Sequence, residues 1–250
     1  MSLAKELVSN QNNPEVDGTT SSEESWRTRQ TDVIFPPGDL YSDEPPLESE
    51  LHLRQIIILL QSLEWLWKDR NDFYGAGNLT IYYSPNQKKS EDFRGPDFFV
   101  VLGTEKKARK SWVVWEENGQ YPHVIVEILS ASTANVDKGF KKQLYQNTFR
   151  TPDYFWFDPY SQEFAGFHLV DGEYQPLQVN AKGYLWSQQL GLYLGIHNKQ
   201  LRFFTSQQKL VSTLEEIAEE LAAKAEQSAA QAERFAAKLR ELNIDPDAIN

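Results

Sequence analysis

The sequence predicts an α/β fold: a mixed central sheet flanked by helices and extended by an antiparallel meander, then a long C-terminal helix. Two changes in the spacing of apolar residues along the sequence support this prediction. Apolar residues recur at helical spacing over residues 48–70, whereas apolar and polar side chains alternate after residue 71, as they do in strands. A second helical segment, residues 137–148, interrupts the strands, as expected when helices cover both faces of a sheet.

Composition divides the chain into three parts. Residues 1–34 are rich in Asn, Ser, Thr and Glu without apolar periodicity, which is typical of a disordered segment. Residues 35–205 carry the predicted sheet and form one domain, and residues 206–250 carry the C-terminal helix. The formal net charge of −11 is concentrated in the two ends, so charge neither excludes nor favours a nucleic-acid partner for the near-neutral middle.

The first predicted helix extends from about Glu48 to Arg70, and either Glu48 or Ser49 is expected to cap it. His52 lies on this helix, where a histidine is more often a packed or surface residue than a ligand. The apolar residues of the helix recur three or four positions apart, so that one face packs on the sheet: Leu53, Ile56, Ile57, Leu60, Leu63, Leu66 and Trp67.

Short segments with period two are predicted strands, separated by Gly, Pro, Asn or Lys-rich breaks. A last hairpin is expected around residues 197–199. The strand segments before the second helix are FYGAGNLTIYYS, DFFVVLG, WVVWEE and VIVEILS, and those after it are YFWFDP, EFAGFHLV and YQPLQV.

The C-terminal helix is predicted from Ser206 to Leu242 and has the spacing of a coiled coil. A helix with an apolar seam rarely stays unpaired in water, so a homodimer or a higher homo-oligomer is expected. The seam consists of Ala218, Leu221, Ala225, Ala232, Phe235, Leu239 and Leu242, and Ser228 interrupts it.

Two acidic residues mark the candidate functional site. Glu127 stands inside the apolar run VIVEIL, where a carboxylate is costly unless a metal or another cation compensates its charge. Asp97 begins a strand after Pro96. If the two strands are neighbours, the carboxylates converge and repel each other unless a divalent cation lies between them. Mg²⁺ suits this position because it prefers oxygen ligands.

The second helix supplies a positive charge. Asp137, Lys141 and Tyr145 are spaced four residues apart and share a stripe with Phe140 and Leu144, which is apolar and should carry Lys141 inward. A lysine near two acids can orient a water molecule or stabilise charge that develops on phosphate. Together with a metal ion, these groups favour hydrolysis of phosphodiesters.

This arrangement resembles the PD-(D/E)XK nuclease superfamily and, more closely, the Uma-type restriction endonuclease family, over about residues 35–205. One departure is Leu129, which stands where the superfamily has a lysine; the resemblance implies that Lys141 replaces it. The residues that carry the resemblance are Pro96-Asp97, Glu127-Ile128-Leu129-Ser130, Ser132-Thr133, Asp137, Lys141, Tyr145 and residues 153–159, with Glu48, Ser49 and His52 on the first helix.

The resemblance implies a restriction-endonuclease-like fold and an endonuclease that hydrolyses DNA with Mg²⁺, or with Mn²⁺ in its place. Asp97, Glu127 and the backbone carbonyl of Ile128 would bind the metal. Lys141 would orient or activate the attacking water. Secondary candidates are Glu48, His52, Asp137 and Tyr145.

Two alternatives remain open at this stage. Glu127 and Lys141 could form a structural ion pair, while Asp97 could be a turn residue. The rival function is a non-catalytic nuclease-fold module that binds or assembles through its C-terminal helix. The chain has no cysteine, no signal-peptide pattern and no apolar run long enough to cross a bilayer, so a cytoplasmic protein without a membrane partner is expected.

Overall fold

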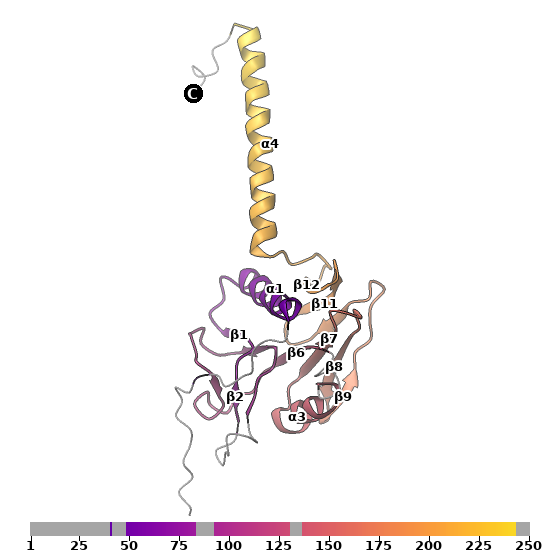
Figure 1. Ribbon diagram of the computed structural model, residues 1–250. Helices are drawn as coiled ribbons and strands as arrows, with labels where there is room; N and C mark the ends of the chain where they lie inside the picture. Colours follow the sequence, from indigo (N-terminus) through magenta and orange to yellow (C-terminus); the bar gives the residue numbers. More distant parts are fainter. Residues whose placement is uncertain (1–40, 42–48, 84–92, 131–136, 244–250) are drawn as a thin grey trace, which may run out of the picture. The chain divides into compact units, whose positions relative to one another are not determined.

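A computed structural model describes residue 41 and residues 49–83, 93–130 and 137–243 (Figure 1). All of these residues belong to the compact unit Phe35–Asn250. The predicted disordered segment 1–34, Glu48 and Ser132-Thr133 lie outside the described residues.

The central element is a six-stranded mixed sheet, as predicted, in the order β1-β4-β6-β7-β8-β9. Only β6 and β7 run parallel; their connection contains the second helical segment, since parallel neighbours require a crossover. The other neighbours are antiparallel. The strands are β1 Phe73–Gly77, β4 Phe98–Leu102, β6 Val124–Ile128, β7 Asp153–Phe157, β8 Phe164–Val170 and β9 Glu173–Pro176.

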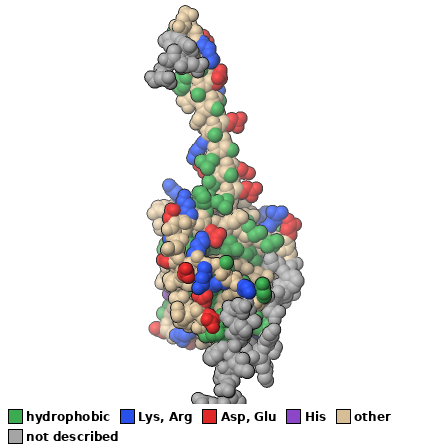
Figure 2. Space-filling model, turned by 90° about the vertical axis from the view of Figure 1, so that its left-hand side faces the viewer, with side chains coloured by type: hydrophobic (Ala, Val, Ile, Leu, Met, Phe, Trp, Pro, Cys, Tyr) green, Lys and Arg blue, Asp and Glu red, His purple; other side chains and the backbone are tan. Residues whose placement is uncertain are grey.

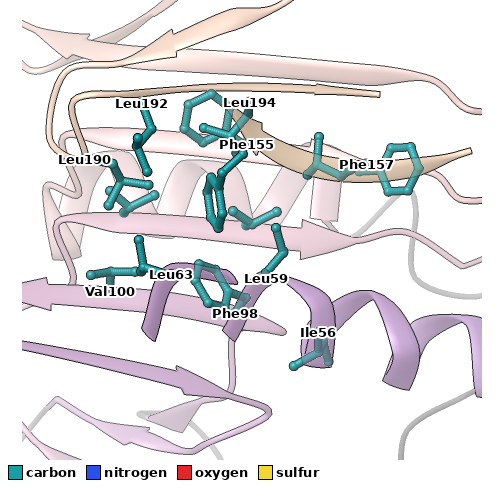
Figure 3. Packing of buried hydrophobic residues seen from close by; sticks show 14 of the residues in the cluster. Ile56, Leu59, Leu63, Phe98, Val100, Phe155, Phe157, Leu190, Leu192 and Leu194 are labelled. Atoms are coloured by element: carbon teal, nitrogen blue, oxygen red, sulfur yellow. The ribbon is translucent and has the colours of Figure 1, made fainter. Parts of the chain in front are cut away.

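Helix α1, Glu50–Leu66, covers one face of the sheet. Its N-cap is Ser49, whose side chain accepts a hydrogen bond from the His52 amide. Figure 3 shows Ile56, Leu59 and Leu63 beside side chains of the sheet. The helix ends four residues before the predicted Arg70, and its buried stripe is narrower than predicted. Three residues of the predicted stripe are exposed instead: Leu53, Ile57 and Leu66.

A small antiparallel sheet shares this face with α1: β10 Leu185–Ser187, β11 Leu192–His197 and β12 Gln200–Phe204. Gln55 of α1 joins the helix to β12, because its side chain donates a hydrogen bond to the Leu201 carbonyl and accepts one from the Leu201 amide. The predicted hairpin is confirmed as β11–β12. Its turn residues Asn198 and Lys199 both have positive φ, which suits the twist of a tight hairpin.

The opposite face carries the helical segment 137–149, predicted as residues 137–148. It consists of two π-helical turns, η1 Asp137–Lys141 and η2 Tyr145–Phe149, around a short α-helical turn, α3 Lys142–Leu144. Tyr145 and Phe149 are buried against the sheet. Phe140, predicted on the inward stripe, is 54% exposed, because Lys141 and Tyr145 occupy the side that faces Glu127.

Two predicted strand segments are shorter than expected. FYGAGNLTIYYS divides at Asn78, which has positive φ, into β1 and β2 Ile81–Tyr82. WVVWEE contributes only β5 Trp112–Val113 before the chain turns. Strand β2 pairs with β5 and with β3 Phe93–Arg94 to form a third sheet.

The long C-terminal helix is α4, Leu214–Glu241, which begins eight residues later than predicted. The preceding segment packs along β12 instead, through the buried Val211 and a hydrogen bond from its amide to the Phe203 carbonyl. Thr213 and Glu216 then form a capping box at the start of α4. Across the described ranges, no helix is both long and apolar enough to cross a membrane.

Candidate active site

The register of β4 and β6 places Asp97 opposite Glu127. Phe98 pairs with Val126 in this antiparallel ladder, so the residue before Phe98 faces the residue after Val126. Directly opposed residues point to the same face of a sheet, with Cβ atoms roughly 4.5–5.5 Å apart. The two carboxylates therefore converge, as expected for neighbouring strands.

Asp97 is buried immediately before β4 and is contacted from two elements. Its Oδ2 accepts a 2.7 Å hydrogen bond from the backbone amide of Ile128, and its Oδ1 lies 2.9 Å from Nε2 of His52 on α1. Burial opposes ionisation of Asp97, but the adjacent imidazole of His52 and the charge of Lys141 outweigh it. These groups hold the pKa of Asp97 below its usual value, so the carboxylate is ionised at neutral pH.

Glu127 is fully buried in the middle of β6 and is held by the helical segment 137–149. Tyr145 donates a 2.6 Å hydrogen bond to Oε1, and Lys141 Nζ lies 3.1 Å from Oε2. Burial, followed by the charge of Glu127, raises the pKa of Tyr145 well above its usual value, so its hydroxyl remains a donor. The side chain of Lys141 is 17% exposed and therefore reaches solvent from this buried pair.

The structure brings most of the predicted site residues together. His52, a secondary candidate, contacts Asp97, and Tyr145 contacts Glu127. Leu129, in the position of the superfamily lysine, is an apolar residue that is 1% exposed, so the cation beside Glu127 comes from Lys141.

Three predictions about site residues stay predictions. The Ile128 amide donates to Asp97, and nothing in the structure tests the metal-binding role that the resemblance implies for the Ile128 carbonyl. Asp137 is the first residue of η1, and its side chain lies outside the described part of the chain. Glu48 also lies outside it. The sequence carried no signal for the amide contact, which follows from strand register alone.

The donor set suits a hard divalent cation. Asp97 and Glu127 together offer four carboxylate oxygens on the same face of the sheet, and each oxygen contacts at least one protein group. Within the described ranges, no group of three His, Asp or Glu side chains forms a ready metal cluster. A cation here would thus use two carboxylates and complete its shell with water, backbone or substrate oxygens, which is common for Mg²⁺.

A third buried carboxylate, Asp153, lies outside the candidate site in a hydrogen-bonded cluster between strands. Its Oδ1 lies 2.7 Å from His168 Nδ1, and its Oδ2 accepts hydrogen bonds from the Ser187 hydroxyl and the Gln189 amide. These are the residue types of a serine-hydrolase triad. The Ser187 hydroxyl donates to Asp153, however, and in a triad it would donate to the imidazole. The cluster therefore joins β7 and β8 to β10.

A family model matches most of the chain. The family model Uma2, described as "Putative restriction endonuclease", matches residues 23–202. No curated protein matches the chain. One similar solved structure is described as "a putative nuclease belonging to DUF820 from Anabaena variabilis ATCC 29413". It is 13% identical, with a TM-score of 0.41, over 60% of this chain and 78% of that chain.

Proposed function

Because the chain belongs to the Uma2 family, which confirms the resemblance found in the sequence, we propose that it is an endonuclease that hydrolyses DNA phosphodiester bonds with Mg²⁺. The observation that carries the proposal is the pairing of two carboxylates across β4 and β6, with a partly exposed lysine beside one of them. Asp97, Glu127 and the carbonyl of Ile128 would hold the cation. Mn²⁺ fits the same oxygen donors.

Each residue of the site would have a separate role in hydrolysis. Water attacks the phosphorus, the bond from phosphorus to one bridging oxygen breaks, and a phosphomonoester and a hydroxyl group result. Lys141 reaches solvent and would orient the attacking water or stabilise negative charge on the phosphate. Tyr145 holds Glu127, and the Ile128 amide and His52 hold Asp97, so both carboxylates are fixed before substrate binds. A bound divalent cation supplies a Lewis acid for the phosphoryl oxygen.

A non-catalytic nuclease-fold module is the second candidate function. The observation that favours it is that every carboxylate oxygen of the site already has a protein contact, as in a structural ion-pair network. The two candidate functions differ in whether the site binds a metal ion and cleaves DNA.

Cleavage of supercoiled plasmid in Mg²⁺ tests the proposed activity. Glu127→Gln, Asp97→Ala and Lys141→Ala should each lower the cleavage rate by at least about 100-fold, because each removes a metal ligand or a group that acts on the water. Lys138→Ala is the matched control, since Lys138 lies in the same π-turn but pairs with the exposed Glu163. Wild-type cleavage by Glu127→Gln would overturn the proposal.

A further inference from the structure

Helix α4 presents an apolar face that no described residue covers. The helix has 28 residues, about 42 Å at the usual rise, and none of them is buried. Its large apolar side chains are among the most exposed in the described chain, Leu221 and Phe235 both at 61%. Figure 2 shows hydrophobic side chains on the surface of α4 among acidic and basic ones. A helix of this kind gains stability by pairing this face with another helix.

The apolar face follows two series with a period of seven residues. Every residue of both series lies on one side of the helix, as at the a and d positions of a coiled coil. The first series is Ala218, Ala225, Ala232 and Leu239, and the second is Leu221, Ser228, Phe235 and Leu242.

We infer that α4 pairs with α4 of a second copy of this chain, and that the two helices run antiparallel. In an antiparallel pair, each residue of one series faces a residue of the other series across the seam. One register uses all eight residues and places Leu242 opposite Ala218 and Phe235 opposite Ala225. The remaining pairs are Ser228 opposite Ala232 and Leu221 opposite Leu239.

Side-chain size favours this orientation. In the antiparallel register, Phe235 and Leu242 each face an alanine, so large and small residues interlock in these layers, and Leu221 faces Leu239. A parallel pair would place Phe235 opposite Phe235 and each of three alanines opposite itself. Such layers alternate between crowded and underfilled, which costs packing energy.

Charge favours the same orientation. Residues 214–227 contain five Glu and one Lys, a net charge of −4, whereas residues 228–241 contain two Glu, two Arg and one Lys, a net charge of +1. An antiparallel pair brings the acidic half of one helix beside the basic half of the other. A parallel pair would place the two acidic halves side by side, where they repel. Side-chain size and charge therefore both favour an antiparallel pair of α4 helices.

The absence of native cysteine allows a cross-linking test on the full chain. Leu221→Cys and Leu239→Cys face each other in the antiparallel register, so the two variants, mixed and oxidised, should form a covalent heterodimer. Each variant oxidised alone should stay monomeric on a denaturing gel, because identical positions lie roughly 27 Å apart along the seam. Ala223→Cys and Ala237→Cys lie level with each other in the same register but on the opposite face of the helix, and they should not cross-link when mixed.

Either of two results would overturn the inference. Covalent homodimers of Leu221→Cys alone would show a parallel pair, and no cross-link in any mixture would show that no second copy covers this face. The molar mass from light scattering gives an independent check. Phe235→Glu should halve the mass of the wild type, whereas Ala237→Glu, two residues away on the outer face, should leave it unchanged. Neither the cross-linking nor the light-scattering measurement depends on nuclease activity.

Discussion

At the scale of single residues, the site depends on how the buried charge of Glu127 is compensated. Its two oxygens contact Lys141 and Tyr145, whose spacing of four residues follows from the sequence. The apolar run around Glu127 made this residue recognisable, because an uncompensated carboxylate does not persist among Val and Ile. The individual contacts were less predictable, because they depend on strand register and on which side chain of the helical segment turns inward.

Tyr145→Phe tests the role of the tyrosine hydroxyl. The ring remains in its pocket, but Glu127 Oε1 loses a 2.6 Å hydrogen bond, so stability should fall by about 1–3 kcal/mol in urea unfolding. The cleavage rate should fall as well, since Glu127 is then less firmly positioned. Tyr174→Phe is the control, because the Tyr174 hydroxyl is also buried and donates to the Thr151 carbonyl outside the site. Equal loss of cleavage in both variants would assign Tyr145 a structural role only.

At the scale of elements, the sequence located the helices and most strands but not their ends. Apolar spacing predicted helix α1 and the segment 137–149. It did not predict the two π-helical turns of that segment, since such turns carry no periodicity signal of their own. The start of α4 was misplaced, because residues 206–213 are polar enough for a helix surface but follow the edge of β12. Tertiary contacts, not local preference, set these boundaries.

Gly77→Ala tests how closely α1 must approach the sheet. A Cβ at Gly77 would lie 2.2 Å from Ile56 Cγ2 and 3.4 Å from the Asp97 carbonyl oxygen, so α1 would have to shift. We expect a loss of about 1–3 kcal/mol in urea unfolding, with weaker cleavage because α1 also carries His52. Gly75→Ala on the same strand is the control, since its new Cβ would meet only Leu60 at 3.6 Å. A Gly77→Ala variant as stable as Gly75→Ala would contradict this account.

The junction between β12 and α4 predicts a pH dependence. Arg202 is buried and donates two hydrogen bonds to Glu216, which lower the pKa of Glu216 from 4.5 to about 2. A carboxyl whose folded-state pKa is lowered stabilises the fold above its unfolded pKa, and this contribution is lost as pH falls through the folded value. Wild type should therefore be more stable than Glu216→Gln at pH 7.

The difference between these two proteins should shrink as the pH falls below 4.5 toward 2. Its size is modest, because the Glu216 side chain is 39% exposed and solvent screens the pair. Urea unfolding of both proteins at pH 7, 5, 4 and 3 measures it. A difference that stays constant over this range would show that the ion pair does not contribute. Glu219→Gln, on the exposed side of α4, should show no difference from wild type at any of these pH values.

At the scale of the whole molecule, a nuclease-family domain is followed by a helix outside the family match. The match ends at residue 202, before α4 begins, so the family predicts the site but not the assembly. The spacing of apolar residues, helical in some segments and alternating in others, predicted the α/β class. The family match identifies the fold as that of a nuclease family. The antiparallel direction inferred for α4 rests on how side-chain size and charge differ between the two halves of the helix, which no single heptad shows.

The central claim is that Asp97 and Glu127 form a metal centre and not a structural ion pair. Melting curves of wild type and Glu127→Gln, each in Mg²⁺ and in EDTA, test it most directly. Mg²⁺ at a hundredfold excess over its Kd should stabilise the wild type by about 2.7 kcal/mol. Glu127→Gln should respond far less because it lacks a ligand, whereas Glu163→Gln, which removes an exposed carboxylate, should respond as the wild type does. A wild type with the same Tm in Mg²⁺ and EDTA, together with a Glu127→Gln variant destabilised by about 3–5 kcal/mol, would contradict the claim.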